Sequence, residues 1–322
     1  MKGWLILLIA MTLAQTAPES FPQATISNGR IRAIVYFPNA KTGYYQGTRF
    51  DWSGMVWSLK WKDHEYFGQW FDRYDPKTHD AITGPVEEFL TGADSALGYD
   101  EAKPGETFVR IGVGTVRKPS EQAYRRYETY EIVDSGNRTV NKDASAVEFI
   151  HELDDKSSGY AYVYRKKLRL VKDTLVLEHR LKNTGRKPIS TSVYDHNFFT
   201  LDTQQTGPDF VLRFPFDPRA MRPLNGFAEL RGRDMTFLKT FERGQTVFSE
   251  IEGFGPRSSD YDFRLENKKT GAGVHITGDR PLLKLYFWSA WKTVCPEPYI
   301  DVSVAPGQES TWRITYEFYD RR

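Results

Sequence analysis

The stretch YAYVYRKKLRLVKDTLVLEHRLKNTGRKPISTSVYDHNFFTL, residues 160–201, decides the fold class. It contains three runs rich in aliphatic, Thr and aromatic residues: Tyr160–Val171, Thr174–Lys182 and Ser190–Leu201. Residues of these types favour β-strands. The turn-forming sequence Asn183-Thr184-Gly185 separates the second run from the third. The stretch therefore predicts successive strands joined by turns.

Similar runs occur along most of the chain, with no segment of strong helical periodicity. The further expected strands are Ile31–Phe37, Met55–Trp61, Phe108–Val116, Tyr127–Val133, Ala146–Leu153, Asp209–Phe214, Thr246–Ile251, Tyr261–Asn267, Leu282–Trp288, Tyr299–Val304 and Ser310–Tyr319. Strands at this spacing indicate an all-β protein built as a large antiparallel β-sandwich.

One segment departs from this pattern. Residues 73–106 are rich in Gly, Pro and Asp and show no clear alternation. They are predicted to form a long irregular loop, and long loops in compact domains often serve function. We therefore expect this loop to form one wall of a site.

Composition narrows the function classes. The chain has 322 residues, 15% of them aromatic, and a formal net charge of +2 with acids and bases mixed along its length. Nothing resembles a linker, so residues 15–322 are predicted to form one domain. The balanced charge argues against a nucleic-acid partner, which usually selects for a basic patch. Cys295 is the only cysteine, so the fold is predicted to hold without an internal disulfide.

The N-terminus has the pattern of a secretory signal peptide, residues 1–14. Lys2 supplies the positive charge, Trp4–Leu13 is a short apolar run, and Thr12 and Ala14 are small residues before a cut at Gln15. An uncleaved membrane anchor is the alternative, although about ten apolar residues are too few to span a bilayer comfortably. The pattern predicts a periplasmic or secreted bacterial protein with no membrane span after cleavage.

Two segments carry candidate chemistry. His196 ends an expected strand that is almost free of charge, so it is either a buried core histidine or a site residue that gives and takes protons near neutral pH. Glu297 is fixed between Pro296 and Pro298, which restrict its backbone; it is either a site carboxylate or an ordinary turn residue. Trp288 and Trp291 precede it and are either core residues or flat faces on which a sugar ring stacks.

Four pieces of the C-terminal half, in matching order and at roughly matching spacing, resemble aldose 1-epimerases (galactose mutarotases). Asp195–Leu201 resembles the Asn-His-x-Tyr-Phe-Asn-Leu stretch whose His is the catalytic acid of that family, and Leu175–Gly185 resembles the strand and turn before it. Cys295–Pro298 looks like the strand end that bears the catalytic Glu, and Ala305–Phe318 looks like the closing turn and last strand.

The N-terminal half departs further from that family. Ile82–Phe89 is the nearest match to a Leu-His-Gly-Gly-x-x-Gly-Phe segment, and Thr83 stands where the family has a sugar-contacting His. His79 is a loop residue that either replaces that His or faces solvent. Glu87 and Glu88 add charge that the family segment lacks, and they are candidate substrate contacts. Arg49 either matches a sugar-binding Arg of the family or pairs with Asp51 on the surface.

The resemblance implies a galactose mutarotase-like supersandwich that interconverts sugar anomers, with Glu297 as the base and His196 as the acid. Such a reaction needs no metal and no cofactor, and no His-x-x-x-His or Cys-x-x-Cys pattern occurs in the chain. Two alternatives stay open. One is a carbohydrate-binding or polysaccharide-processing sandwich, for which a hydrolase would use Glu87 or Glu88 together with Glu297. The other is a structural role in which His196 and Glu297 are a buried pair.

Overall fold

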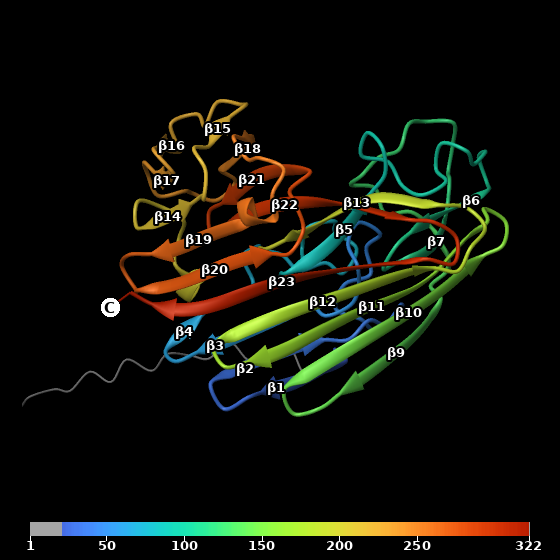
Figure 1. The fold of residues 1–322 in the computed structure, drawn as a ribbon, viewed down its shortest axis with the longest axis horizontal. Coiled ribbons are helices and arrows are strands. Elements are labelled where there is room, and N and C mark those ends of the chain that lie inside the picture. The colour runs from blue at the N-terminus through green and yellow to red at the C-terminus, as the bar shows by residue number, and fades with distance from the viewer. Residues whose placement is uncertain (1–20, 322) are drawn as a thin grey trace, which may run out of the picture.

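The protein is built from antiparallel β-sheets, as shown by a computed structural model that describes residues 21–321 (Figure 1). The predicted signal peptide, residues 1–14, lies outside the described residues. Within residues 21–321 there is no α-helix, and the helical turns are the two short 3₁₀ segments η1 (Leu201–Thr203) and η2 (Ser258–Asp260). No helix in this part of the chain is long and apolar enough to cross a membrane. The predicted all-β antiparallel class is confirmed.

The largest sheet has ten strands, and the stretch quoted above supplies two of its central members. Long strands with alternating burial, such as β11, show one face turned to the core and one to solvent. In spatial order the strands are β16 (Ala228–Arg231), β17 (Asp234–Phe237), β14 (Phe210–Arg213), β19 (Asp262–Asn267), β20 (Ala272–Gly278), β23 (Glu309–Asp320), β12 (Thr174–Asn183), β11 (Tyr160–Val171), β10 (Ala146–Asp155) and β9 (Asn137–Lys142).

A six-stranded sheet lies behind the large sheet in Figure 1. Its order is β15 (Arg219–Ala220), β18 (Thr246–Glu252), β21 (Lys284–Ala290), β22 (Thr293–Val304), β13 (Ile189–His196) and β5 (Val86–Leu90). Two smaller sheets complete the fold. They are formed by β1 (Gln23–Ser27), β2 (Ile31–Tyr36), β3 (Val56–Trp61) and β4 (His64–Glu65), and by β6 (Thr107–Arg110), β7 (Gly114–Arg117) and β8 (Ile132–Asp134).

The six-stranded sheet is covered on both faces. One apolar cluster joins it to the large sheet and includes Leu177 of β12 and Val193 of β13. A second, more aromatic cluster lies on its other face and includes Trp52, Tyr194 and Phe198. Every residue from 293 to 300 of β22 is buried, as expected for a strand between two packed layers. The side chains on the second face form the candidate site.

Local backbone chemistry explains where the expected strands are wrong. The run Phe108–Val116 is a hairpin and not one strand, because Gly112 and Gly114 adopt φ of 83° and 147° and reverse the chain. The run Tyr127–Val133 is strand only from Ile132 onward. The expected strand Ser190–Leu201 ends at His196, since Phe198 has φ of 43° and turns the backbone.

Two differences bring sequence-distant residues together. The expected loop 73–106 contains β5, which pairs with β13 from Val86↔His196 to Leu90↔Ser192. The last strands also differ, because β22 begins at Thr293 rather than at Tyr299 and pairs with β21 across both of its prolines. Glu297 therefore lies inside a central strand instead of a turn.

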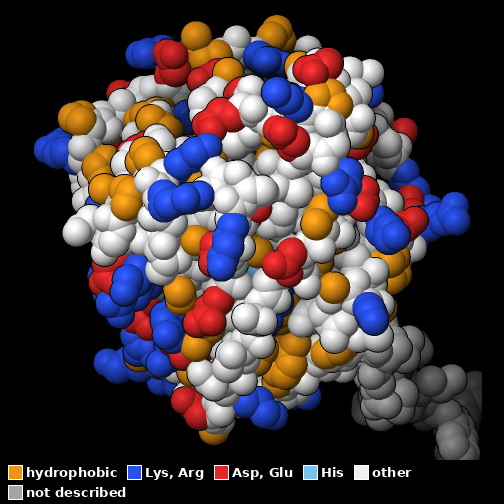
Figure 2. All heavy atoms as spheres, turned by 90° about the vertical axis from the view of Figure 1, so that its right-hand side faces the viewer, with side chains coloured by type: hydrophobic (Ala, Val, Ile, Leu, Met, Phe, Trp, Pro, Cys, Tyr) orange, Lys and Arg blue, Asp and Glu red, His pale blue; other side chains and the backbone are white. Residues whose placement is uncertain are grey.

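Figure 2 shows Lys and Arg side chains interspersed with Asp and Glu over the face that it draws. This distribution agrees with the mixed charge of the sequence. The absence of a nucleic-acid partner stays a prediction.

The packed interface predicts a strong position dependence along β12. Leu177 is completely buried between the sheets, whereas Lys182 of the same strand is exposed. We expect Leu177→Ala to lower the free energy of unfolding by about 2–5 kcal/mol, because it leaves a cavity. Lys182→Ala should change it by less than about 0.5 kcal/mol. Urea unfolding followed by tryptophan fluorescence measures both, and equal effects would show that the two sheets are not packed together.

Candidate functional site

His196 and Glu297 lie side by side at the centre of the six-stranded sheet. The regular pairing of β13 with β22 ends at Tyr194↔Tyr299. Side chains two residues apart on a strand share a face. His196 therefore lies on the same face as Tyr194, and Glu297 lies on the same face as Tyr299, which is the same side of the sheet. The His196 Nε2 atom is 3.2 Å from Glu297 Oε1, and both side chains are about 95% buried. The structure thus brings together two residues that are 101 positions apart.

Aromatic rings hold the imidazole in one orientation. The Phe198 ring stacks flat on it with centroids 3.7 Å apart, and Phe50 and Trp288 contact it edge-on at 5.7 and 5.6 Å. The positive φ of Phe198 is unusual for a bulky residue and is typically maintained only where the surrounding structure enforces it. This turn is what places the Phe198 ring against His196.

Asn197 fixes the spacing of the two strands where their backbone pairing stops. Its Nδ2 donates to the Pro296 carbonyl at 2.7 Å, next to Glu297. The Tyr316 hydroxyl lies 2.8 Å from Asn197 Oδ1 and holds the amide in place. The backbones of β13 and β22 are therefore tied together beside the His196–Glu297 contact.

A buried ionic cluster supports the wall of the site. The Glu88 carboxylate is fully buried and accepts hydrogen bonds from Arg49 Nε at 2.9 Å, Arg126 Nη2 at 2.7 Å and the Tyr194 hydroxyl at 2.6 Å. Arg110 Nη2 is 3.6 Å away. Burial alone would raise the pKa of Glu88, but the Arg126 and Arg49 guanidiniums outweigh it and hold the pKa well below its usual range. Glu88 is therefore a permanent anion and not a proton donor.

A pocket of about 190 Å³ opens over the His196–Glu297 pair. Drug-sized ligands occupy pockets of roughly 300–1,000 Å³, so this one fits a ligand no larger than about one sugar ring. Its wall combines aromatic faces with a few charged groups. The lining residues are Arg49, His79, Asp80, Arg126, Tyr127, His196, Phe198, Phe248, Tyr286, Trp288 and Glu297.

Five of the eight residues predicted from the sequence line this pocket: His196, Glu297, Arg49, His79 and Trp288. The half-buried His79 ring lies 4.8 Å from the Tyr127 ring at the pocket mouth. Arg49 is buried and bonded to Glu88, so the surface pair with Asp51 is wrong.

Three predicted substrate contacts do not reach the pocket. Glu88 lies behind the arginines that line it, and Glu87 faces the opposite side of β5, toward Lys166. Trp291 packs against the core, with the Arg243 and Lys292 side chains over its ring at 4.9 and 4.3 Å. Strand alternation along β5 separates Glu87 from Glu88, and Trp291 lies in the turn that follows β21.

The sequence reading missed Arg126, Tyr127, Phe248 and Tyr286. Arg126 and Tyr127 belong to the run Tyr124-Arg125-Arg126-Tyr127, in which basic and aromatic residues gather in a segment assigned in part to a strand. That mixture was the available clue. Phe248 gave none, because it reaches the site by pairing with Trp288 across β18 and β21.

Burial shifts both members of the central pair toward their neutral forms. It raises the pKa of Glu297 to about 7, although Arg126 and Arg49 act in the opposite direction. It lowers the pKa of His196 well below the usual value, and the charge of Arg49 adds to this effect. Near neutral pH His196 is therefore neutral, and Glu297 beside it is close to the midpoint of its titration.

A second buried cluster lies on the other face of β5 and β13, between the two large sheets. Glu87, His179 and Asp195 each offer one ligand atom, and these atoms all lie within 4.8 Å of one another. Glu87 Oε1, His179 Nε2 and Asp195 Oδ1 have no hydrogen-bond partner. Among residues 21–321 this is the group of His, Cys, Asp and Glu side chains placed to hold a metal ion.

The charges around this cluster favour a proton over a divalent ion. Asp51, Glu87 and Asp195 supply three carboxylates, against the two cations Lys166 and Arg138, all of them buried or nearly so. One proton cancels the remaining negative charge, whereas a divalent ion leaves an excess of one positive charge in the core. Burial raises the pKa of Asp195 to about 6 and that of Glu87 well above its usual range, in agreement with a shared proton.

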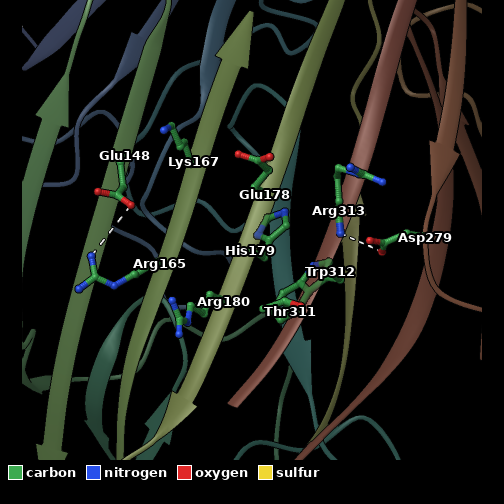
Figure 3. Close-up of a pocket in the computed structure, with 10 residues that line it drawn as sticks. All are labelled: Glu148, Arg165, Lys167, Glu178, His179, Arg180, Asp279, Thr311, Trp312 and Arg313. Carbon is green, nitrogen blue, oxygen red and sulfur yellow. Dashed lines mark hydrogen bonds and ion pairs between the residues drawn. The ribbon is translucent and has the colours of Figure 1, made fainter. Parts of the chain in front are cut away.

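A larger cavity of about 410 Å³ lies on the ten-stranded sheet, away from the His196–Glu297 pair (Figure 3). Most of the charged side chains around it come from neighbouring strands. Glu148 forms an ion pair with Arg165, and the backbone N–H of Arg313 donates a hydrogen bond to the Asp279 carboxylate. Between them lie His179 and Trp312, whose rings stack at 4.8 Å. Size alone therefore does not identify the candidate site, since the smaller pocket holds the His196–Glu297 pair.

No protein-family model matches the sequence, and no curated protein matches it. Solved structures do match the fold. A galactose mutarotase related enzyme from Lactobacillus acidophilus is 15% identical, with 92% of this chain and 97% of that chain covered and a TM-score of 0.56. A GalM/aldose epimerase homologue from C. elegans is 13% identical, with coverages of 94% and 100% and a TM-score of 0.57. A galactose mutarotase-like protein from Clostridium acetobutylicum is 12% identical, with coverages of 92% and 94% and a TM-score of 0.56.

The protein thus has the β-sandwich fold of the galactose mutarotase-like superfamily, as the sequence resemblance predicted. At these identities the likeness establishes the fold, and the chemistry has to be argued from the site itself.

The second buried cluster, which contains Glu87 and Asp195, makes the free energy of unfolding depend on pH in a specific way. Because the pKa of Asp195 is raised to about 6 in the folded protein, against about 3.9 when unfolded, its share of stability is complete below pH 4 and is lost as pH rises through 6. Asp195→Asn keeps the shape of the side chain but cannot titrate, so we expect this pH-dependent contribution to be absent from the variant. Relative to the parent, the variant should gain about 1 kcal/mol in free energy of unfolding between pH 5 and pH 7.5.

Urea unfolding at the two pH values measures this difference, with Asp217→Asn as the exposed control. If the free energy of unfolding changed by the same amount between the two pH values in parent and variant, the proposed shared proton would be excluded. If the cluster instead binds a divalent ion, added Zn²⁺ should stabilise the parent and EDTA should reverse the gain.

Proposed function

We propose that the protein is an aldose 1-epimerase-type enzyme that interconverts the α and β anomers of a sugar. The observation that carries the proposal is the 3.2 Å contact between His196 Nε2 and Glu297 Oε1 at the base of a sugar-sized pocket. The shared fold agrees with this activity but does not by itself supply it. Trp288 offers the flat apolar face that a pyranose ring needs.

Anomer exchange needs two proton transfers. Ring opening breaks the bond between C1 and the ring oxygen while the C1 hydroxyl loses a proton and the ring oxygen gains one, which gives the open aldehyde. Rotation about C1–C2 and closure on the other face reverse both transfers. One group must hold a proton while its neighbour is free to accept one, and a pair that carries a single mobile proton meets both demands.

The mobile proton has two positions in this pair. With the proton on His196, the imidazolium is the acid and the Glu297 carboxylate is the base, as the sequence resemblance implies. With the proton on Glu297, the roles are exchanged, and burial favours this neutral form. Either form transfers one proton to the sugar and removes one from it, so catalysis requires only that the pair hold the proton.

The other predicted contacts have binding roles in this proposal. Arg49 and His79 line the pocket beside the pair and donate hydrogen bonds to sugar hydroxyls. A polysaccharide hydrolase is less well supported, because it needs a second carboxyl group across the scissile bond. Glu88 is bound by arginines and Glu87 is on the other face of the sheet. If the protein binds sugars but does not interconvert their anomers, it is a non-catalytic sugar-binding module.

Substitution of either member should slow catalysis strongly without unfolding the protein. We expect His196→Ala and Glu297→Gln each to lower kcat by about 10²–10⁴-fold, because each removes one of the two proton transfers. Two-dimensional NMR exchange between the anomers of a panel of aldoses measures the rate. Arg213→Gln, on an exposed pair in the large sheet, is the control and should match the parent. If the anomers of every sugar exchanged at the uncatalysed rate in the presence of the parent protein, the proposed epimerase activity would be excluded.

The rate should also depend on pH in a defined direction. Burial raises the pKa of Glu297 to about 7, so the mobile proton is retained below that value and is lost above it. We expect kcat/KM to be level below about pH 6, to fall to about half near pH 7 and then to fall by up to about tenfold per pH unit. Polarimetry corrected for the spontaneous rate at each pH checks this limb. A rate that rises steadily from pH 7 to 9 would be incompatible with a required proton on the pair.

A further inference from the structure

The pocket wall carries more positive charge than its acids neutralise. Arg49, Arg110 and Arg126 surround a single buried carboxylate, Glu88. Their side chains are 7%, 1% and 15% exposed, so bulk water compensates little of the excess. Uncompensated buried charge is costly, and such an arrangement at a pocket is typical of a site prepared for a charged ligand.

Two of these guanidiniums have unused donors. Arg49 bonds Glu88 through Nε and Tyr194 through Nη2. Arg126 uses Nε and Nη2 for Glu88, and Nη2 also for Tyr194 and Tyr299. Among the residues that the structure describes, neither Nη1 group has a protein acceptor, and neither is fully enclosed. Since both side chains line the pocket, their free donors are available to a ligand there.

The donors are held rigidly. The Arg49 guanidinium lies between two rings, 4.3 Å from the centroid of Phe50 and 4.8 Å from that of Tyr127. Arg126 is fixed by hydrogen bonds to both oxygens of Glu88. A planar guanidinium fixed in this way loses little entropy on binding and matches the oxygen geometry of carboxylate, phosphate or sulfate groups.

The charges around the pocket indicate the sign and the magnitude of the charge that a bound ligand would carry. When Glu297 holds its proton, the acids near the pocket are Glu88 and Asp80, and Asp80 lies at the mouth, about one third exposed and 3.6 Å from His79. Three guanidiniums against these two carboxylates leave one positive charge. A ligand with a single negative group cancels it, whereas a neutral sugar leaves it in place.

We propose that the substrate is a sugar that carries an anionic group, a carboxylate, phosphate or sulfate, bound by the Nη1 groups of Arg49 and Arg126. This inference rests on the proposed anomer exchange for its reaction, and on the guanidinium geometry alone for its ligand class. The bound anion also screens the field that the two arginines exert on Glu297 and so favours the protonated, active pair. The falling limb of kcat should therefore lie at higher pH than that of kcat/KM.

Matched sugars test the proposal. NMR anomer exchange and equilibrium binding are measured at pH 6.5 for glucose, glucuronate, glucose 6-phosphate and glucose 6-sulfate, and for galactose and galacturonate. We expect at least one anionic sugar to exceed its neutral partner tenfold or more in kcat/KM, and the best one identifies the source of the charge. Raising the salt from 50 to 500 mM should reduce that advantage severalfold and leave the neutral sugar unaffected.

Variants separate charge from folding. Arg126→Gln should remove most of the anionic advantage, measured within each variant as the ratio of kcat/KM for the anionic sugar to that for its neutral partner, whereas Arg126→Lys, which keeps the charge, should retain part of that ratio. Because Arg126→Gln also weakens the hold on buried Glu88, the salt dependence of the unmodified protein provides a test without any substitution. Arg213→Gln again serves as the exposed control.

The outcomes distinguish the two proposals. Equal exchange rates for neutral and anionic sugars, with no salt effect, would overturn the anionic substrate and keep the epimerase. If no sugar is exchanged, the epimerase fails and binding decides: tighter, salt-sensitive binding of the anions retains the charge inference, and equal or absent binding removes it.

Discussion

The pleat of two neighbouring strands, β5 and β13, is the constraint on which the site depends. Alternate side chains of a strand point to opposite faces, and both strands are covered on both sides. Glu88, Tyr194 and His196 therefore lie on the side of the sheet that carries the pocket, while Glu87 and Asp195 face the large sheet. A shift of one residue in this register would exchange the two sets and remove the site entirely.

This constraint explains why so much charge is buried near the centre of the protein. Each face of the pair of strands carries its own carboxylates, and each set is matched with cations from elsewhere in the chain. Glu88 is held by arginines from the segments between strands, and Glu87 is held by Lys166 of β11. Removal of one partner from such a buried pair typically costs about 3–5 kcal/mol. The two networks thus fix the position of β5 from both sides.

The two networks have opposite chemical consequences. Around Glu88 the cations are in excess, so that carboxylate stays ionised and the pocket wall stays positive. Around Asp195 the carboxylates are in excess, and burial favours a proton. His196 lies between them in sequence, one residue from Asp195, but its imidazole belongs to the pocket, where burial and aromatic packing keep it neutral. A proton shared with Glu297 then becomes the feature that the proposed chemistry uses.

The sequence by itself determined the all-β class, the position of most long strands and the identity of the central pair, because β propensity, turn residues and a few ordered motifs are local properties. It also nominated Arg49, His79 and Trp288, which reach the pocket. Only the tertiary structure decided which neighbouring residues share a face. Glu87 and Glu88 are adjacent in sequence and yet serve different networks, and Trp288 and Trp291 are divided between the pocket and the core. The contributions of Arg126, Tyr127 and Phe248 were likewise outside the reach of the sequence, because long-range strand pairing and loop packing place them there.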